Sequence, residues 1–180
     1  ILSDLIGDRL DVNASGPTVP DNSTFKDAMD VIKKYNLEDR LPENVMILLK
    51  QGLRGEIKDT PKEGLIKDRT FIMGSLKHAL TAVKEKVVSM GYETEIIASE
   101  LQGEARDAAR YLSAKAIKVQ QSLKSGDKHR CLISGGETSV TLKGNGLGGR
   151  NQELALAFSI EIEGMNGITM LSAGTDGTDG

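Results

Sequence analysis

A glycine-rich loop over residues 144–149, Gly-Asn-Gly-Leu-Gly-Gly, is the segment best suited to hold an anion. A helix is expected directly after it, from about Asn151 to Glu163. Glycines allow the backbone to approach a ligand closely, and the start of a helix carries a partial positive charge of about half an electron. The spacing predicts a phosphate site here, at Gly146, Gly148, Gly149 and Asn151. The alternative is a flexible hairpin loop.

Arg150 follows this loop and stands where the helix should begin. A cation in the first turn opposes the helix dipole by roughly 0.3 to 1 kcal/mol, so a compensating anion is expected beside it. A guanidinium also offers a planar fork of donors that suits a phosphate or a phosphoryl group in transit. Arg150 is therefore a candidate for phosphate binding, and the alternative is an exposed surface arginine.

Two acidic segments supply further candidates. Asp176 and Asp179 follow an expected strand over 168–171, at the strand end where open α/β sheets bind ligands. Near the start of the chain, Asp4, Asp8 and Ser15 lie in a turn-rich stretch. Such groups could hold Mg²⁺, accept a hydrogen bond from a substrate hydroxyl or act as a general base. Both segments could instead be ordinary acidic turns.

The same glycine loop formally matches the GxGxxG fingerprint of dinucleotide-binding enzymes. Two features argue against that interpretation. The preceding strand, residues 139–143, alternates polar and apolar residues, and the acidic residue expected about 20 positions on is missing. The chain also contains no GxxxxGK[ST], GxSxG or HExxH motif, which excludes a standard P-loop from it.

These groups need a scaffold, and from residue 70 onward the hydrophobic pattern alternates between strands and helices. Helices are expected to begin at Ser75, near Ala105 and at Asn151. Strands separated by such helices favour an α/β fold with a mostly parallel sheet and flanking helices, a Rossmann-like three-layer arrangement. The expected strands are 70–73, 94–98, 131–133, 140–142 and 168–171. Before residue 65, Thr24 and Asp27 form a capping box for a helix over 25–35, and a second helix is expected over 43–51.

The composition and charge of the chain argue against several classes of protein. The 180 residues carry a formal net charge of -3 without a basic cluster, which argues against nucleic acid as a partner. No apolar run has the length of a membrane span, and the first residues lack the pattern of a signal peptide. Cys131 is the only cysteine, so no intrachain disulfide can form. A cytoplasmic protein without a membrane partner is expected.

Together, five blocks of this sequence resemble the glycerate 2-kinase family, whose C-terminal region is called the MOFRL domain. Gly-Gly-Arg-Asn-Gln-Glu at 148–153 and Gly-Thr-Asp-Gly at 174–177 are the most diagnostic. The resemblance implies two α/β domains with the active site between them, residues 1–65 ending the first and 66–180 forming most of the second. An essential lysine of the family belongs to an earlier part of the first domain. The five blocks are 3–21, 103–106, 132–138, 146–153 and 171–180.

The resemblance implies an enzyme that transfers the terminal phosphoryl group of ATP to a hydroxyl of D-glycerate, at the 2-position in this family, with Mg²⁺ or another divalent cation. Arg150 would stabilise the charge on the transferring group. Asp4 would be the first-domain carboxylate that faces the substrate, with Asp8 in reserve. The residues that would cradle phosphates or line the cleft are Gly135, Gly136, Glu137, Thr138, Asn151, Asp176 and Asp179.

Two other functions stay open on the sequence alone. The GxGxxG match, and a name sometimes attached to this family, suggest an NAD(P)-dependent hydroxypyruvate reductase. A non-catalytic anion-binding module gains weight if the natural chain has only 180 residues. The expected partner is the small molecule glycerate, and a homo-oligomer is compatible with the sequence.

Overall fold

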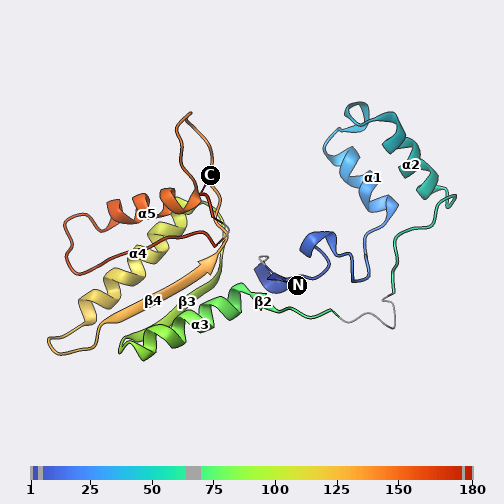
Figure 1. Cartoon of the computed structure of the whole chain (residues 1–180). Helices are drawn as coiled ribbons and strands as arrows, with labels where there is room; N and C mark the ends of the chain where they lie inside the picture. Colours follow the sequence, from blue (N-terminus) through green and yellow to red (C-terminus); the bar gives the residue numbers. More distant parts are fainter. Residues whose placement is uncertain (1, 4–5, 64–69, 176, 180) are drawn as a thin grey trace. The chain divides into compact units, whose positions relative to one another are not determined.

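The computed structural model describes residues 2–3, 6–63, 70–175 and 177–179, which group into two compact units (Figure 1). One unit lies within Asp8–Ile72, and the other combines Leu2–Gly7 with Met73–Gly180. This division by contacts places Leu2, Ser3, Ile6 and Gly7 with the second unit. The assignment of residues 1–65 and 66–180 to two domains of a larger enzyme stays a prediction.

A parallel sheet organises the second unit. Strand β3 (Glu93–Leu101) pairs in parallel with β4 (Arg130–Gly136), with Glu93 opposite Arg130 and register shifts after Ile96 and Ala98. The shorter strands β1 (Leu2–Ser3) and β2 (Gly74–Ser75) also pair in parallel. The predicted α/β class with a parallel sheet is confirmed.

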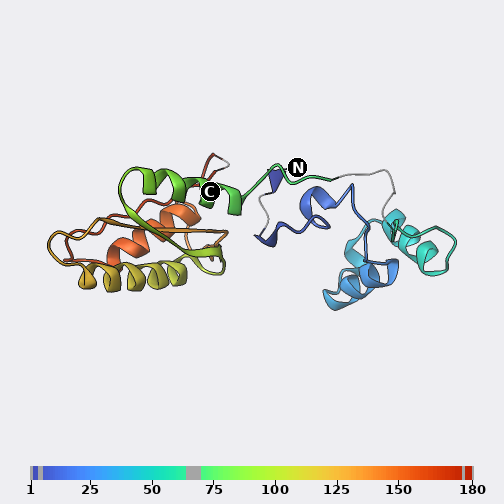
Figure 2. The same cartoon turned by 90° about the horizontal axis from the view of Figure 1, so that it is seen from below.

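Helices cover both faces of the β3–β4 sheet (Figures 1 and 2). Helix α3 (Leu76–Ser89) packs on one face. Helix α4 (Ala105–Ser122), which connects the two strands, and α5 (Arg150–Glu161) lie on the other. Small and apolar side chains of α4 and α5 form the main buried cluster of this unit: Ala105, Ala108, Ala109, Leu112, Leu154 and Phe158.

Three predicted strands are wrong. Residues 70–73, 140–142 and 168–171 are not strands, although Ser139 makes one isolated bridge to Glu104. Val140, Ile168 and Met170 are instead partly buried against the α4–α5 cluster. Their apolar side chains are covered by helices without a backbone ladder, and the sequence pattern cannot distinguish these two ways of being buried.

The first unit is a small helical pair. Helix α1 (Phe25–Lys34) buries Met29 and Ile32, and α2 (Glu43–Leu53) packs against it where Gly52 leaves room for the ring of Phe25. The predicted capping box of α1 is confirmed. Short 3₁₀ turns of this unit occupy Asn13–Ser15 and Glu38–Arg40, and a further one, Ile6–Asp8, lies where the chain passes from the second unit to the first. In the part of the chain that the structure describes, no helix combines the length and apolar character that a membrane span requires.

Candidate active site at the start of α5

Arg150 is the first residue of α5 and lies beside the end of β4. Its Nη2 atom is 3.7 Å from Oε1 of Glu137, the residue that directly follows β4. The side chains of Arg150 and Glu137 are 39% and 55% exposed. This separation permits an ion pair but is too long for a hydrogen bond. Two of the predicted site residues thus meet, with Glu137 as an anion near the arginine.

A carboxylate from the end of the chain caps the start of α5. Oδ1 of Asp179 accepts hydrogen bonds from the backbone N–H and the side-chain amide of Asn151, both at 3.0 Å. Oδ2 accepts from the backbone N–H of Gln152 at 2.8 Å. These two N–H groups are among those that a helix start leaves without intrahelical partners. The predicted anion-binding position is therefore filled by a group of the chain itself.

The hydrogen bonds and the charge around Asp179 stabilise its ionised carboxylate. Donation from the backbone N–H of Asn151 is the largest cause that holds the pKa of Asp179 below its ordinary value, followed by donation from Gln152. The nearby charge of Arg150 acts in the same direction. Asp179 is ionised at neutral pH and offsets the positive end of the helix.

Asn151 connects the helix start to the segment before Asp179. Its Oδ1 accepts a hydrogen bond from the hydroxyl of Ser172 at 2.7 Å, while its side-chain amide donates to Asp179. Oδ1 and Nδ2 of Asn151 both have partners within the chain. These contacts give Asn151 a structural part, and phosphate binding by this residue stays a prediction.

Three of the predicted phosphate-binding glycines have packing reasons to be glycine. A Cβ at Gly149 would lie 2.5 Å from the carboxyl carbon of Asp179, and one at Gly135 would lie 2.8 Å from a methyl group of Leu76 in α3. Gly136 has a φ of 150°, and a Cβ there would run into the backbone of Leu101. None of these positions needs a ligand to explain it.

The other two glycines are open. At Gly146 and Gly148, no heavy atom of the described chain beyond the adjacent residues lies within 4 Å of where a Cβ would be. The loop that carries them projects from the end of the sheet (Figure 1). Its backbone is free to approach a ligand, so phosphate binding by Gly146 and Gly148 stays a prediction.

A second set of hydrogen bonds fixes the backbone after β4, and the sequence did not predict the side-chain bonds among them. Glu104, at the start of α4, accepts hydrogen bonds from the hydroxyl of Thr141 at 2.5 Å and from its N–H at 3.2 Å. The hydroxyl bond is the largest cause of a lowered pKa for Glu104. The N–H of Glu137 donates to the carbonyl of Leu101 at 2.8 Å. The sequence offered no signal for the Glu104–Thr141 contact beyond an acidic residue at a helix start.

The remaining predicted residues are described only locally, or not at all. Asp8 ends a 3₁₀ turn with a φ of 52°, and Ser15 ends another with a φ of 64°. Thr138 is half-buried directly after Glu137. Asp4 and Asp176 lie outside the described residues.

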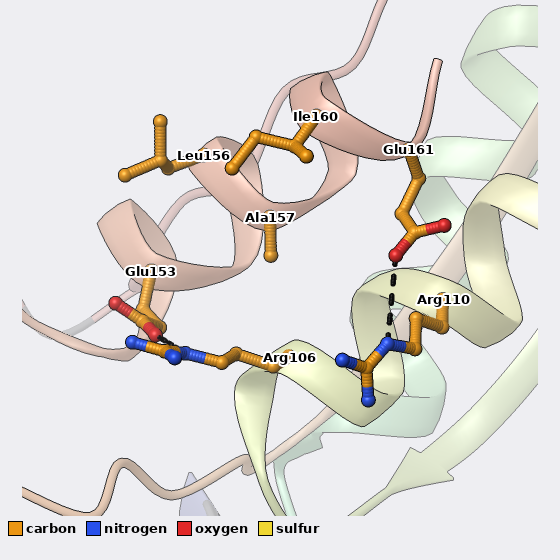
Figure 3. A pocket seen from close by; sticks show the side chains of 7 residues that line it. All are labelled: Arg106, Arg110, Glu153, Leu156, Ala157, Ile160 and Glu161. Atoms are coloured by element: carbon orange, nitrogen blue, oxygen red, sulfur yellow. Dashed lines mark hydrogen bonds and ion pairs between the residues drawn. The ribbon is translucent and has the colours of Figure 1, made fainter. Parts of the chain in front are cut away.

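A shallow groove of about 260 Å³ runs between α4 and α5 (Figure 3). Leu156, Ala157 and Ile160 supply its apolar surface. Two ion pairs border it, one between Arg106 and the half-buried Glu153 and one between the exposed side chains of Arg110 and Glu161. An exposed pair such as the second contributes little to stability. Arg150, Glu137 and Asp179 are not among the lining residues of this groove.

Comparison with known proteins shows which proteins the chain is similar to. Residues 130–180 match the profile described as the MOFRL family, and residues 1–50 match one described as a domain of unknown function (DUF4147). The whole chain is 43% identical to a D-glycerate 2-kinase of Thermotoga maritima and 35% identical to a glycerate 2-kinase of Pyrococcus horikoshii. The chain is thus similar over its whole length to glycerate 2-kinases, and its residues 130–180 match the MOFRL family.

The similarity extends to a solved structure. The crystal structure of a glycerate kinase from Thermotoga maritima matches 99% of this chain and 41% of its own length, with a TM-score of 0.81 and 43% identity. The chain likewise spans 41% of the length of the two glycerate 2-kinases. The family resemblance inferred from the sequence is confirmed.

Proposed function

We propose that this chain functions in an ATP-dependent glycerate 2-kinase, which transfers the γ-phosphoryl group of ATP to the 2-hydroxyl of D-glycerate. The observation that carries the proposal is the 43% identity, over the whole chain, to a protein named D-glycerate 2-kinase. The cluster at the start of α5 supports it, because an arginine at a helix start beside a glycine loop suits a phosphoryl group.

In this reaction the hydroxyl oxygen of glycerate bonds to the γ-phosphorus while the bond from phosphorus to the β,γ-bridging oxygen breaks. ADP leaves with the electrons of that bond, and the hydroxyl gives its proton to a general base, for which the carboxylate of Asp4 is the candidate in this chain. Negative charge is spread over the three equatorial oxygens of the transferring group. Arg150 is the residue of this chain that we assign to that charge, with Asp4 as the carboxylate facing the substrate hydroxyl and Asp8 in reserve.

The pairing of Arg150 with Glu137 suits such a role. An exposed pair at 3.7 Å contributes at most about 1 kcal/mol, so this contact opposes only weakly a turn of the guanidinium toward another anion. A phosphoryl group offers shorter, charge-assisted hydrogen bonds in a bidentate arrangement. We infer that phosphate displaces Glu137 as an anionic partner of Arg150. The open backbone at Gly146 and Gly148 would complete the phosphate site.

Magnesium is proposed as a companion of ATP, since Mg²⁺ is usually held by substrate phosphates and one or two carboxylates. Among the described residues, no three His, Cys, Asp or Glu side chains gather as a metal site. Asp176, which lies outside them, stays the proposed carboxylate of this chain, with Ser15 as a further substrate contact. No step of the mechanism is assigned to the cation here.

The reductase alternative has weaker support. In a dinucleotide fingerprint the third glycine allows close packing of helix against strand. Here that position is Gly149, whose close neighbour is Asp179. The preceding residues, 140–142, are also not a strand. A function as a non-catalytic anion-binding module would not account for the similarity of this chain to kinases.

The test is Arg150→Ala in the complete gene product, with ADP release from ATP and D-glycerate as the measurement. We expect kcat to fall by about 10² to 10³, as when one transition-state donor is removed, with a nearly unchanged unfolding midpoint. Arg110→Gln, which alters an exposed arginine of α4, is the matched control and should keep the parent's turnover. Turnover of Arg150→Ala within a few-fold of the parent would make Arg150 a surface residue. NADH-dependent reduction of hydroxypyruvate without ATP-dependent phosphorylation would overturn the kinase.

A further inference from the structure

We propose that Asp179 is a positioning residue for Arg150, and that it binds neither substrate nor metal. Its carboxylate fixes the first turn of α5 and thereby sets the position from which the guanidinium of Arg150 reaches the transferring phosphoryl group. The inference rests on the proposed kinase function. It replaces the substrate or metal role that the sequence suggested for Asp179.

The first argument is the hydrogen-bonding capacity of the carboxylate. An ionised carboxylate has about four acceptor positions on its two oxygens. Three are used: Oδ1 accepts twice from Asn151, and Oδ2 accepts once from Gln152. Bidentate binding of a cation or of a pair of hydroxyls would require Oδ1 of Asp179 to give up at least one of its two bonds to Asn151. The helix start would then lose its acceptor.

The second argument is electrostatic. Asp179 lies against the positive end of the α5 dipole, and the charge of Arg150 acts on it. A divalent cation held at this position would be repelled by both charges. A single carboxylate is favoured there, because it offsets the helix end and the arginine together.

The third argument concerns the peptide unit that Asp179 holds. The N–H of Asn151 belongs to the peptide bond whose carbonyl comes from Arg150, so this bond fixes the backbone on the carboxyl side of Arg150. On the amino side, Gly149 is packed against Asp179 with no space for a Cβ. The backbone on both sides of Arg150 is thus set by one residue from the end of the chain.

The experiment compares Asp179→Ala and Asp179→Asn in the complete gene product, each alone and combined with Arg150→Ala. We expect Asp179→Ala to lower kcat by about 10- to 100-fold, because small misplacements of a catalytic group cost up to about 10² in rate. The KM for glycerate and the Mg²⁺ concentration for half-maximal rate should change less than about two-fold. With Arg150 already replaced, Asp179→Ala should have almost no further effect.

Asp179→Asn keeps an acceptor oxygen of the same shape and should restore part of the lost rate, which also guards against a folding defect in the alanine variant. The matched control is Thr24→Ala, which removes a cap from α1 and should leave kcat unchanged. A rise of about ten-fold or more in the Mg²⁺ requirement, or additive effects of Asp179→Ala and Arg150→Ala, would overturn the positioning role.

Failure of the kinase proposal is distinguishable from failure of this inference. If the parent protein does not phosphorylate D-glycerate, the proposed function fails. Hydrogen exchange of the α5 start, followed by mass spectrometry, still reports on the cap. Faster exchange of the segment from Gly149 to Gln152 in Asp179→Ala, but not in Thr24→Ala, supports the positioning contact, and unchanged exchange contradicts it.

Discussion

At the starts of both α1 and α5, a carboxylate accepts hydrogen bonds from backbone N–H groups. The two carboxylates lie at different distances along the chain from the helix that they cap. At α1, the hydroxyl of Thr24 accepts from the N–H of Asp27 at 3.2 Å, and the carboxylate of Asp27 accepts from the N–H of Thr24 at 2.8 Å. At α5, the N-cap Gly149 has no side chain, and the carboxylate comes from Asp179, 28 positions after Asn151. One cap is complete within four neighbouring residues, whereas the other requires a distant segment to be in place.

The cap of α1 fixes only the start of its own helix, whereas the cap of α5 also fixes the backbone beside Arg150, a candidate site residue. The α1 box forms wherever Thr24 and Asp27 meet as helix positions N-cap and N3. Ser172 and Asp179 hold the start of α5, so the geometry of this helix start depends on where their distant segment packs. Arg150 is placed at the start that depends on packing.

Gly149→Ala should produce the largest difference between the two helix starts. The new Cβ would lie 2.5 to 2.6 Å from the carboxyl group and the backbone carbon of Asp179, so the cap must move. We expect a loss of about 1 to 3 kcal/mol in the free energy of unfolding, as for other overpacked sites. Hydrogen exchange at the start of α5 should accelerate, while exchange in α1 stays unchanged.

The matched control for Gly149→Ala is Gly144→Ala in the same loop. A Cβ at Gly144 would meet no heavy atom of the described chain within 4 Å beyond its adjacent residues, so this variant should unfold at the parent's midpoint. Equal effects of the two substitutions would mean that loop flexibility, and not contact with Asp179, explains glycine at position 149.

Thr24→Ala should give a smaller and strictly local effect. Removal of a threonine N-cap costs about 1 kcal/mol in typical cases. Exchange should accelerate in the first turn of α1, and the α5 start should keep the parent's protection. Denaturant unfolding together with exchange measures both quantities. Loss of protection at Asn151 in this variant would contradict the independence of the two caps.

The smallest expected effect is on titration. The hydroxyl of Thr24 is the largest cause of the lowered pKa of Asp27, whereas the backbone N–H of Asn151 is the largest cause for Asp179. In both cases the stabilisation is fully present above the ordinary carboxyl pKa of about 3.9 and is lost as the pH falls through the lower folded value. Thr24→Ala should raise the pKa of Asp27 toward its ordinary value, as measured by NMR of the carboxyl carbon.

Asn151→Ala provides the contrasting measurement. It removes the side-chain amide that donates to Asp179 but keeps the backbone N–H, so the pKa of Asp179 should stay below its ordinary value. A return of that pKa to the ordinary range would show that the side-chain contact, and not the helix start, stabilises the charge.

Much of the fold was predictable because its signals are local. The helix expected to begin near Ala105 begins at that residue, and the expected start of α5 differs from the observed one by a single position. The strands expected over 140–142 and 168–171 are not formed, because Val140 and Ile168 are partly buried against the α4–α5 cluster and not in a ladder. Periodicity reports that a side chain is buried, but not which element covers it.

The candidate site likewise has a part that the sequence predicts and a part that it does not. The sequence alone indicated Arg150 at a helix start, the glycines before it and acidic residues at the end of the chain, and these residue types determined that an anion belongs there. Only the tertiary structure decided that the anion at the backbone of α5 is Asp179, and that Glu137 lies nearest to the Arg150 guanidinium among the ion pairs described. The N–H groups at a helix start accept a partner only within about 3 Å. Which distant carboxylate comes that close depends on how the segment from Ile168 to Asp179 packs on α4 and α5, and no pattern among neighbouring residues encodes that.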